Sequence, residues 1–224
     1  VVNCTANTLD ALPTSTTFVA KAQGTNSATG SYFDIIVDGF GEEIFGAWCI
    51  DLDEQLTAGL DVLNAKVYNS LEGWPSDLHE SPQNMFAVNW ILNNLDSDLN
   101  LRDAYTYGEI QTAIWILLED GRTSTGGVGT VDPEKAQELS ARALEEGAGY
   151  EPGCGDLVGI ILVPVDENHI VNKQSVIFAI PLECRSECDE TAWARNSATS
   201  NDTCGNLPGG NWATYFKYDD SNSE

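Results

Sequence analysis

The sequence predicts an α+β fold, in which a mostly β sandwich or barrel-like domain carries an inserted helical segment and a small disulfide-stapled C-terminal region. Three observations lead to this fold class. Strand-like runs occupy both ends of residues 1–182, helix signals gather within about 80–147, and residues 183–224 shift in composition to Cys, Asn, Ser and Gly. With 224 residues, of which 42% are hydrophobic and 20% charged, the chain can bury a large core.

The first third of the chain is rich in the β-branched and aromatic residues that favour strands. A first strand is predicted over 16–23, which is followed by Gly24, and a second over 31–37, which ends at an Asp-Gly turn. A third strand is predicted over 44–51 after a short Gly-rich connection. This third strand places Cys49 near its end.

The middle of the chain carries the start signals of three helices. The first is predicted over 82–95, where a proline follows a serine N-cap. The second, over 107–119, begins with a capping box, because Thr106 is followed three residues later by Glu109, and then shows one apolar stripe. The third is predicted over 133–147 after an Asp-Pro pair.

The last third returns to strands. The β-branched runs 157–164 and 173–180 are separated by a polar turn and are predicted to form a hairpin that closes the sheet. The most apolar stretches of this region, 157–165 and 175–182, are far shorter than the roughly 20 residues that a membrane-spanning helix needs. We therefore expect no membrane span.

Residues 183–224 are predicted to form a small separate module. A disulfide between Cys188 and Cys204 is expected, because the residues between them offer little to bury and a cross-link would stabilise such a loop. The aromatic run 211–218 is predicted to form a terminal strand, which can pair with a neighbouring subunit. We therefore expect self-assembly.

The charge and cysteine content narrow the class of protein. Asp and Glu number 35 against 10 Lys and Arg, a net charge of −25, which excludes binding to nucleic-acid phosphates or anionic lipids. The six cysteines form no pair of CxxC motifs and the two histidines are isolated, which argues against zinc and favours an exported protein with disulfide bonds. The beginning of the chain, which lacks an initiator Met, fits a removed signal peptide. An extracellular or cell-surface location is expected.

The strongest chemical signal is the pairing of Cys49 with Gln111. A cysteine at a strand end and a glutamine on a capped apolar helix can form an internal thioester, in which the thiol sulfur replaces the amide nitrogen and ammonia leaves. Amides resist thiols in water, so the fold must hold the two groups together. Trp48 and Trp115 lie beside them in the sequence and are predicted to shield the bond from water.

These residues resemble the thioester domains of bacterial surface adhesins. In that family a Cys after an aromatic or aliphatic residue is joined to a Gln in an apolar-Gln-x-Ala-apolar-Trp helix, and segment 110–115 fits this motif position by position. The resemblance covers about 33–182 and includes connecting segments such as 67–75. It implies that Cys49 and Gln111 are the cross-linked pair, and that the acyl group captures an amine on a host, matrix or neighbouring-subunit protein.

Two functions follow from these observations. In the first, the protein is a secreted or surface-exposed adhesion or assembly protein with an internal thioester; it needs no external cofactor, has no catalytic residues and is not an enzyme. In the second, it is a non-catalytic structural subunit of an extracellular filament or surface layer. Cys49 is then half of a disulfide, for example with Cys154, and Gln111 only forms hydrogen bonds.

Two acidic segments offer candidate ion ligands. One oxygen-rich loop between predicted helices can hold Ca²⁺ through carboxylate and amide oxygens, supplied by Asp96, Asp98, Asn100 and Asp103. It lacks the central glycine and the final glutamate of an EF-hand, so a solvated connection between two helices is the alternative. The second segment, Asp51, Asp53 and Glu54, is interpreted as a solvated face.

Overall fold

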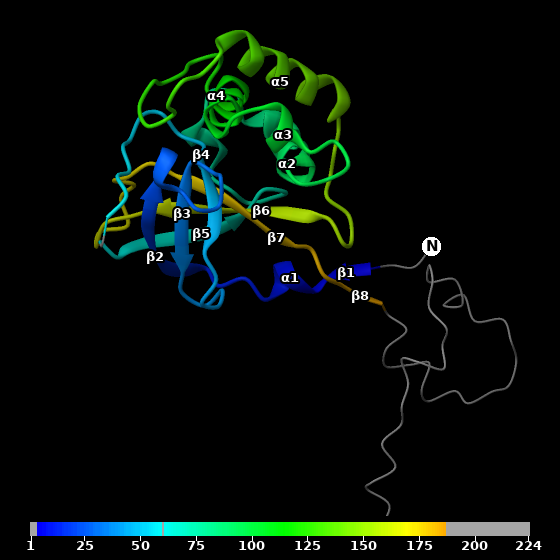
Figure 1. Cartoon of the computed structure of the whole chain (residues 1–224). Coiled ribbons are helices and arrows are strands. Elements are labelled where there is room, and N and C mark those ends of the chain that lie inside the picture. Colours follow the sequence, from blue (N-terminus) through cyan, green and yellow to red (C-terminus); the bar gives the residue numbers. More distant parts are fainter. Residues whose placement is uncertain (1–3, 60, 187–224) are drawn as a thin grey trace, which may run out of the picture. The chain divides into compact units, whose positions relative to one another are not determined.

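The computed structural model describes residues 4–59 and 61–186 (Figure 1). The chain divides into two compact units, and residues 6–183 form the larger one. This unit contains every candidate site residue considered below. β1 (Cys4–Ala6) and β8 (Cys184–Ser186) form a separate two-stranded sheet.

Among the described residues, six strands close into an antiparallel barrel (Figure 1). Around the barrel the strands follow the order β2, β3, β4, β7, β6, β5. Their bounds are Ser15–Gln23 for β2, Phe33–Val37 for β3, Phe45–Cys49 for β4, Leu63–Asn69 for β5, Leu157–Pro164 for β6 and Val176–Pro181 for β7. The prediction of an α+β fold with a barrel-like β domain is therefore confirmed.

Strand β5 is the barrel strand that the sequence did not predict. Its apolar residues alternate with Asn64 and Lys66, which is the two-residue period of a half-buried strand. Only Ala65 and Val67 are buried. The strand forms because β2 and β6 pair with it on both sides, so its backbone groups find partners from distant parts of the chain.

Helices α2 to α5 gather on one side of the barrel (Figure 1). The longer ones are α2 (Met85–Asn94), α4 (Tyr107–Leu118) and α5 (Pro133–Glu146). The short elements are the α-helices α1 (Asn7–Asp10) and α3 (Leu101–Ala104) and the 3₁₀ helices η1 (Gly24–Asn26), η2 (Ser76–Leu78) and η3 (Pro82–Asn84). All three predicted helices are present, and the first turn of the predicted 82–95 helix is the 3₁₀ helix η3.

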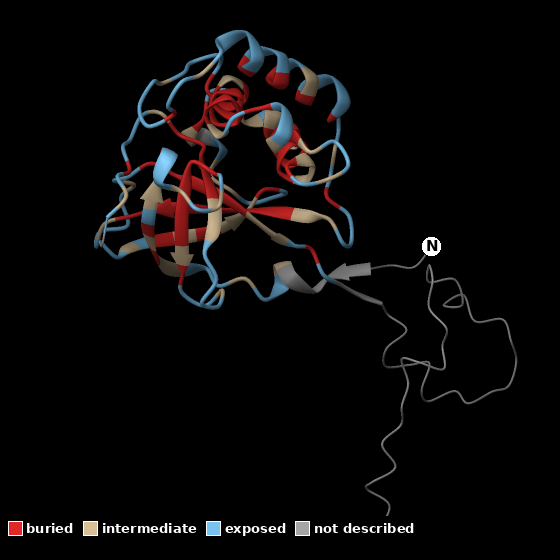
Figure 2. Cartoon of the chain, in the orientation of Figure 1, coloured by how far each residue is buried: buried red, intermediate tan, exposed pale blue. Residues whose placement is uncertain are grey.

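Helix α4 is buried along almost its whole length, because it lies between the barrel and α5 (Figure 2). The predicted capping box is confirmed: the Thr106 hydroxyl accepts from the Glu109 N–H at 3.3 Å, and the Glu109 carboxylate accepts from the Thr106 N–H at 2.8 Å. Gly108 permits close packing of the following loop, since a Cβ there would lie 2.0 Å from the Val128 carbonyl oxygen. These contacts fix where the helix begins and how closely the following loop packs against it.

Some sequence predictions concern other parts of the chain. The disulfide of Cys188 with Cys204 and the terminal strand over 211–218 lie outside the described residues. Within the described residues, no helix has the length and hydropathy that crossing a membrane requires.

Candidate functional site

The register between β4 and β7 brings Cys49 and Gln174 together. Cys49 pairs with Val176, and the Ile50 N–H continues the ladder by donating to the Ser175 carbonyl at 3.1 Å. In this register Ile50 faces Ser175, and the next residue, Asp51, faces Gln174. Since alternate residues of a strand share a face, the side chains of Cys49, Asp51 and Gln174 belong to the same face of the pair.

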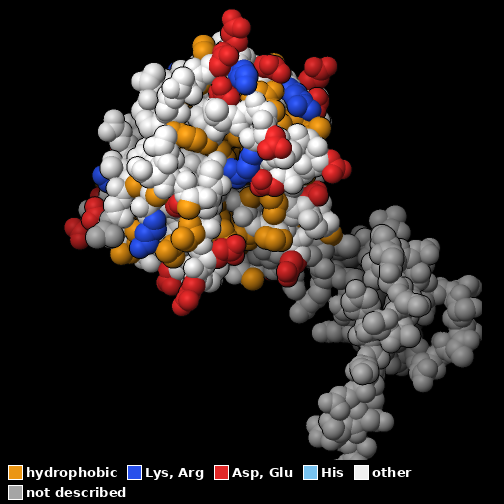
Figure 3. All heavy atoms as spheres, viewed as in Figure 1, with side chains coloured by type: hydrophobic (Ala, Val, Ile, Leu, Met, Phe, Trp, Pro, Cys, Tyr) orange, Lys and Arg blue, Asp and Glu red, His pale blue; other side chains and the backbone are white. Residues whose placement is uncertain are grey.

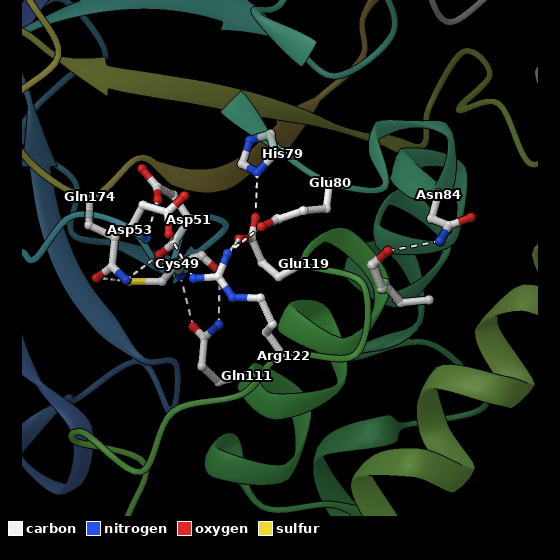
Figure 4. Close-up of polar contacts among 11 residues, drawn as sticks. Cys49, Asp51, Asp53, His79, Glu80, Asn84, Gln111, Glu119, Arg122 and Gln174 are labelled. Atoms are coloured by element: carbon white, nitrogen blue, oxygen red, sulfur yellow. Dashed lines mark hydrogen bonds and ion pairs between the residues drawn. The ribbon is translucent and has the colours of Figure 1, made fainter. Parts of the chain in front are cut away.

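The Cys49 sulfur directly contacts the side-chain amide of Gln174 (Figure 4). The distance from Sγ to Gln174 Oε1 is 2.8 Å, shorter than the roughly 3.5–4.0 Å between packed carbon atoms, although sulfur is larger than carbon. The other end of the amide is also held, because Nε2 donates to the Asp51 carbonyl oxygen. Cys49 is fully buried and Gln174 is 7% exposed. The amide is therefore fixed against the thiol and away from solvent.

Gln111 has a different position in the site. Its Oε1 accepts from the Cys49 N–H and its Nε2 donates to the Cys49 carbonyl, both at 2.8 Å. This fully buried side chain thus replaces a neighbouring strand at the end of β4 and holds the backbone of the cysteine. The sequence prediction paired Cys49 with Gln111; the structure brings the two residues together, but it places Gln174 against the sulfur.

Sequence reasoning missed Gln174, which lies 125 residues after Cys49 and just before β7. The sequence did contain a signal: the amide side chain of Gln174 stands directly before a run of β-branched residues that is buried. That signal identifies a partner for Cys49 only when β7 is known to be the neighbour of β4.

Cys49 is a free cysteine. The alternative in which Cys49 forms a disulfide, for example with Cys154, is therefore wrong for this structure. Burial raises the pKa of the Cys49 thiol well above its ordinary value, and the charge of Asp51 raises it further. The sulfur is thus held as a neutral thiol in a dry site.

Buried aromatic side chains belong to the same core as Cys49. Trp115 is 1% exposed, its ring meets Tyr32 edge to face at 5.6 Å, and its Nε1 has no hydrogen-bond partner. Burial raises the pKa of Tyr32 to about 12. Trp48 is equally buried, but it precedes Cys49 in the strand and therefore faces the opposite side of β4.

A charge cluster connects the segment after β4 to the end of α4 (Figure 4). The Arg122 guanidinium pairs with Asp53 at 2.7 Å, with Glu80, and with the buried Glu119 at 3.6 Å. Glu119 also contacts His79 Nδ1 at 2.8 Å. The carboxylates of Asp53, Glu80 and Glu119 converge within 4.8 Å, and Arg122 supplies the positive charge among them. The segment that follows Cys49 is thereby tied to the helix that carries Gln111.

The predicted calcium loop lies between α2 and α4, and several of its side chains bind one another. Asn100, in the left-handed region at φ 39°, donates to Asp103 at 2.6 Å, and Arg102 pairs with Asp96 at 3.1 Å. Among the described residues, the acidic group that converges is that around Arg122, not this loop. Calcium binding through Asp96, Asp98, Asn100 and Asp103 stays a prediction.

Two solved structures that are similar to this chain are N-terminal thioester domains. One belongs to a protein F2-like fibronectin-binding protein from Streptococcus pneumoniae: the TM-score is 0.42, the identity 10%, and the match covers 75% of this chain and 94% of that one. The other belongs to a surface protein from Clostridium perfringens, solved as a cysteine-to-alanine mutant: the TM-score is 0.45, the identity 10%, and the match covers 74% and 99%. The resemblance seen in the sequence is to this same class of domain.

Comparison at the level of sequence gives no further relative. No protein-family model matches the chain, and no curated protein matches it.

Proposed function

We propose that the protein forms an internal thioester between Cys49 and Gln174 and uses it to attach covalently to an amine on an external protein surface. The observation that carries this proposal is the buried 2.8 Å contact between Cys49 Sγ and Gln174 Oε1. A thiol and an amide held in contact gain an effective concentration that no bimolecular reaction in water reaches. Gln111 contributes by holding the Cys49 backbone on both sides.

The reaction has two steps. In the first, the sulfur attacks the Gln174 side-chain carbon, the C–N bond breaks, and the thiol proton leaves with the amide nitrogen as ammonia. In the second, a primary amine attacks the same carbon, the C–S bond breaks, and Cys49 becomes a thiol again. Because Gln174 ends as a substituted amide, each molecule reacts once, and the protein acts as a covalent adhesin rather than an enzyme.

Burial explains how the bond would last until a target arrives. Water is excluded by the surrounding core, in which Trp115 and Tyr32 pack together. Acidic side chains are prominent on the face drawn in Figure 3, and the sequence contains 35 Asp and Glu against 10 Lys and Arg. That surface suits an exposed protein on the cell surface and favours targets with basic residues around the reacting amine.

Intact mass spectrometry of the unreduced, folded protein tests the proposal. The wild type should be lighter than its sequence by one ammonia, and methylamine should add at Gln174, leaving the chain heavier than its sequence by one CH2 group, and expose one alkylatable thiol at Cys49. Cys49→Ala and Gln174→Met should show neither effect. A folded wild type with the full sequence mass and no methylamine uptake would contradict the proposal.

A third variant decides which glutamine is the acyl donor. Gln111→Met should retain the ammonia loss wherever it folds, because the Gln111 amide forms its hydrogen bonds with the backbone of Cys49 and not with the sulfur. Loss of the mass change in folded Gln111→Met, with its retention in Gln174→Met, would restore the pairing predicted from the sequence. Self-assembly through residues 211–218 is not part of this proposal and stays a prediction.

A further inference from the structure

Asp51 is a buried carboxylate at the centre of the site. Its exposed fraction is 4%, although the sequence placed it on a solvated face with Asp53 and Glu54. The extended β4–β7 register sets it opposite Gln174 and on the same face as Cys49. Its carbonyl oxygen accepts from Gln174 Nε2, the nitrogen that leaves when the thioester forms. Asp51 therefore adjoins both partners of the reaction (Figure 4).

The acyl transfer needs a group that moves a proton. The Cys49 thiol must lose its proton to become a strong nucleophile, and an amide nitrogen leaves only when it is protonated. Because burial excludes water from the site, solvent does not carry the proton from the thiol to the amide nitrogen. The site itself must supply this function.

Asp51 and Tyr32 are two titratable side chains in the region of Cys49: Asp51 belongs to the same face of the strand, and Tyr32 belongs to the same buried core. Tyr32 is engaged elsewhere, since its hydroxyl donates to the Gly126 carbonyl at 2.5 Å and accepts from Gln23 Nε2 at 3.0 Å. The Asp51 carboxylate has one such engagement, because Oδ1 accepts from the Asp53 N–H at 2.8 Å. A carboxylate has lone pairs to spare for a second donor.

We propose that the Asp51 carboxylate carries the proton during thioester formation; this inference rests on the thioester proposed above. As the Cys49 sulfur attacks the Gln174 carbon, Asp51 takes the thiol proton. It then gives that proton to the Gln174 nitrogen as the C–N bond breaks, so one ammonia leaves and Asp51 is again a carboxylate. No external acid, base or oxidant is needed.

The same group then acts when an amine reacts with the thioester. Attack by an amine is the formation step run backwards with a substituted nitrogen, so the group that protonated the leaving nitrogen also deprotonates the entering one. A primary amine attacks as its free base, after an ammonium ion has given one proton to the solvent. Asp51 takes a proton from the attacking nitrogen and passes it to the Cys49 sulfur as the C–S bond breaks, so Asp51 is again a carboxylate.

The test is the rate of ammonia loss during refolding, followed by intact mass, in Asp51→Asn. Asparagine has nearly the same shape and still accepts from the Asp53 N–H, but it cannot take a proton. We expect the rate to fall roughly 10²–10⁴-fold, the usual contribution of a positioned acid or base. Asp51→Glu should recover much of the rate, and the matched control Glu54→Gln, which alters an exposed neighbouring carboxylate, should remain within a few-fold of wild type.

The outcomes separate the two proposals. If the wild type loses no ammonia, the thioester itself fails. If the wild type loses ammonia and folded Asp51→Asn does so within about threefold of its rate, Asp51 has no role in proton transfer and the thioester stands. If Asp51→Asn does not fold, as judged by near-UV circular dichroism in a Cys49→Ala background, Asp51→Ser takes its place with the same expected loss of rate.

Discussion

Replacing Gln111 by Met should destabilise the fold through the backbone of Cys49. Methionine matches glutamine in length and shape but cannot form either hydrogen bond, so the Cys49 N–H and C=O would each be buried without a partner. A buried polar group left unsatisfied costs about 1–3 kcal/mol. Two such groups predict a loss of about 2–6 kcal/mol in the free energy of unfolding.

The assay is denaturant unfolding in a Cys49→Ala background, so that a missing cross-link does not add to the effect. The midpoint should fall while the m-value stays constant. Gln137→Met, on the exposed face of α5, is the matched control and should change stability by less than about 0.5 kcal/mol. A loss below about 1 kcal/mol for Gln111→Met would show that these buried groups find other partners, and would refute the role of Gln111 as a backbone clamp.

Three further outcomes are expected. Trp115→Ala should cost about 3–5 kcal/mol, because the ring is 1% exposed, and should speed hydrolysis of the thioester, as followed by intact mass over time. Thr106→Ala removes the N-cap of α4 and should lower the free energy of unfolding by about 1 kcal/mol in the same denaturant assay; no change would mean that packing alone fixes the helix start. Burial raises the pKa of Glu119, so its folded form binds a proton more tightly than its unfolded form; the resulting stability is present at low pH and is lost as pH rises through the raised pKa. Glu119→Gln should therefore flatten the decline of Tm with rising pH, and an unchanged slope would assign the decline to other groups.

Features that depend on neighbours within a few residues were predictable. The capping box of α4 joins Thr106 to Glu109, three positions apart, and the sequence shows it directly. The strands over 16–23 and 157–164 could be assigned because β-branched runs between turn residues indicate strands in any context. Strand β5 was not predicted, although its apolar and polar residues alternate as in a half-buried strand; its place in the barrel depends on its pairing with β2 and β6.

The sequence by itself determined that Cys49 lies at a strand end, that a capped helix carries Gln111, and that the chain folds as a β domain with inserted helices. Only the tertiary structure decided which glutamine touches the sulfur and that Asp51 is buried. The physical reason is that a strand's own sequence specifies which side chains share a face, but not which strand pairs with it or in which register. The pairing of β4 with β7 joins residues more than a hundred positions apart and brings the Gln174 side chain against the Cys49 sulfur. Gln111, on α4, instead forms a hydrogen bond with the backbone N–H of Cys49.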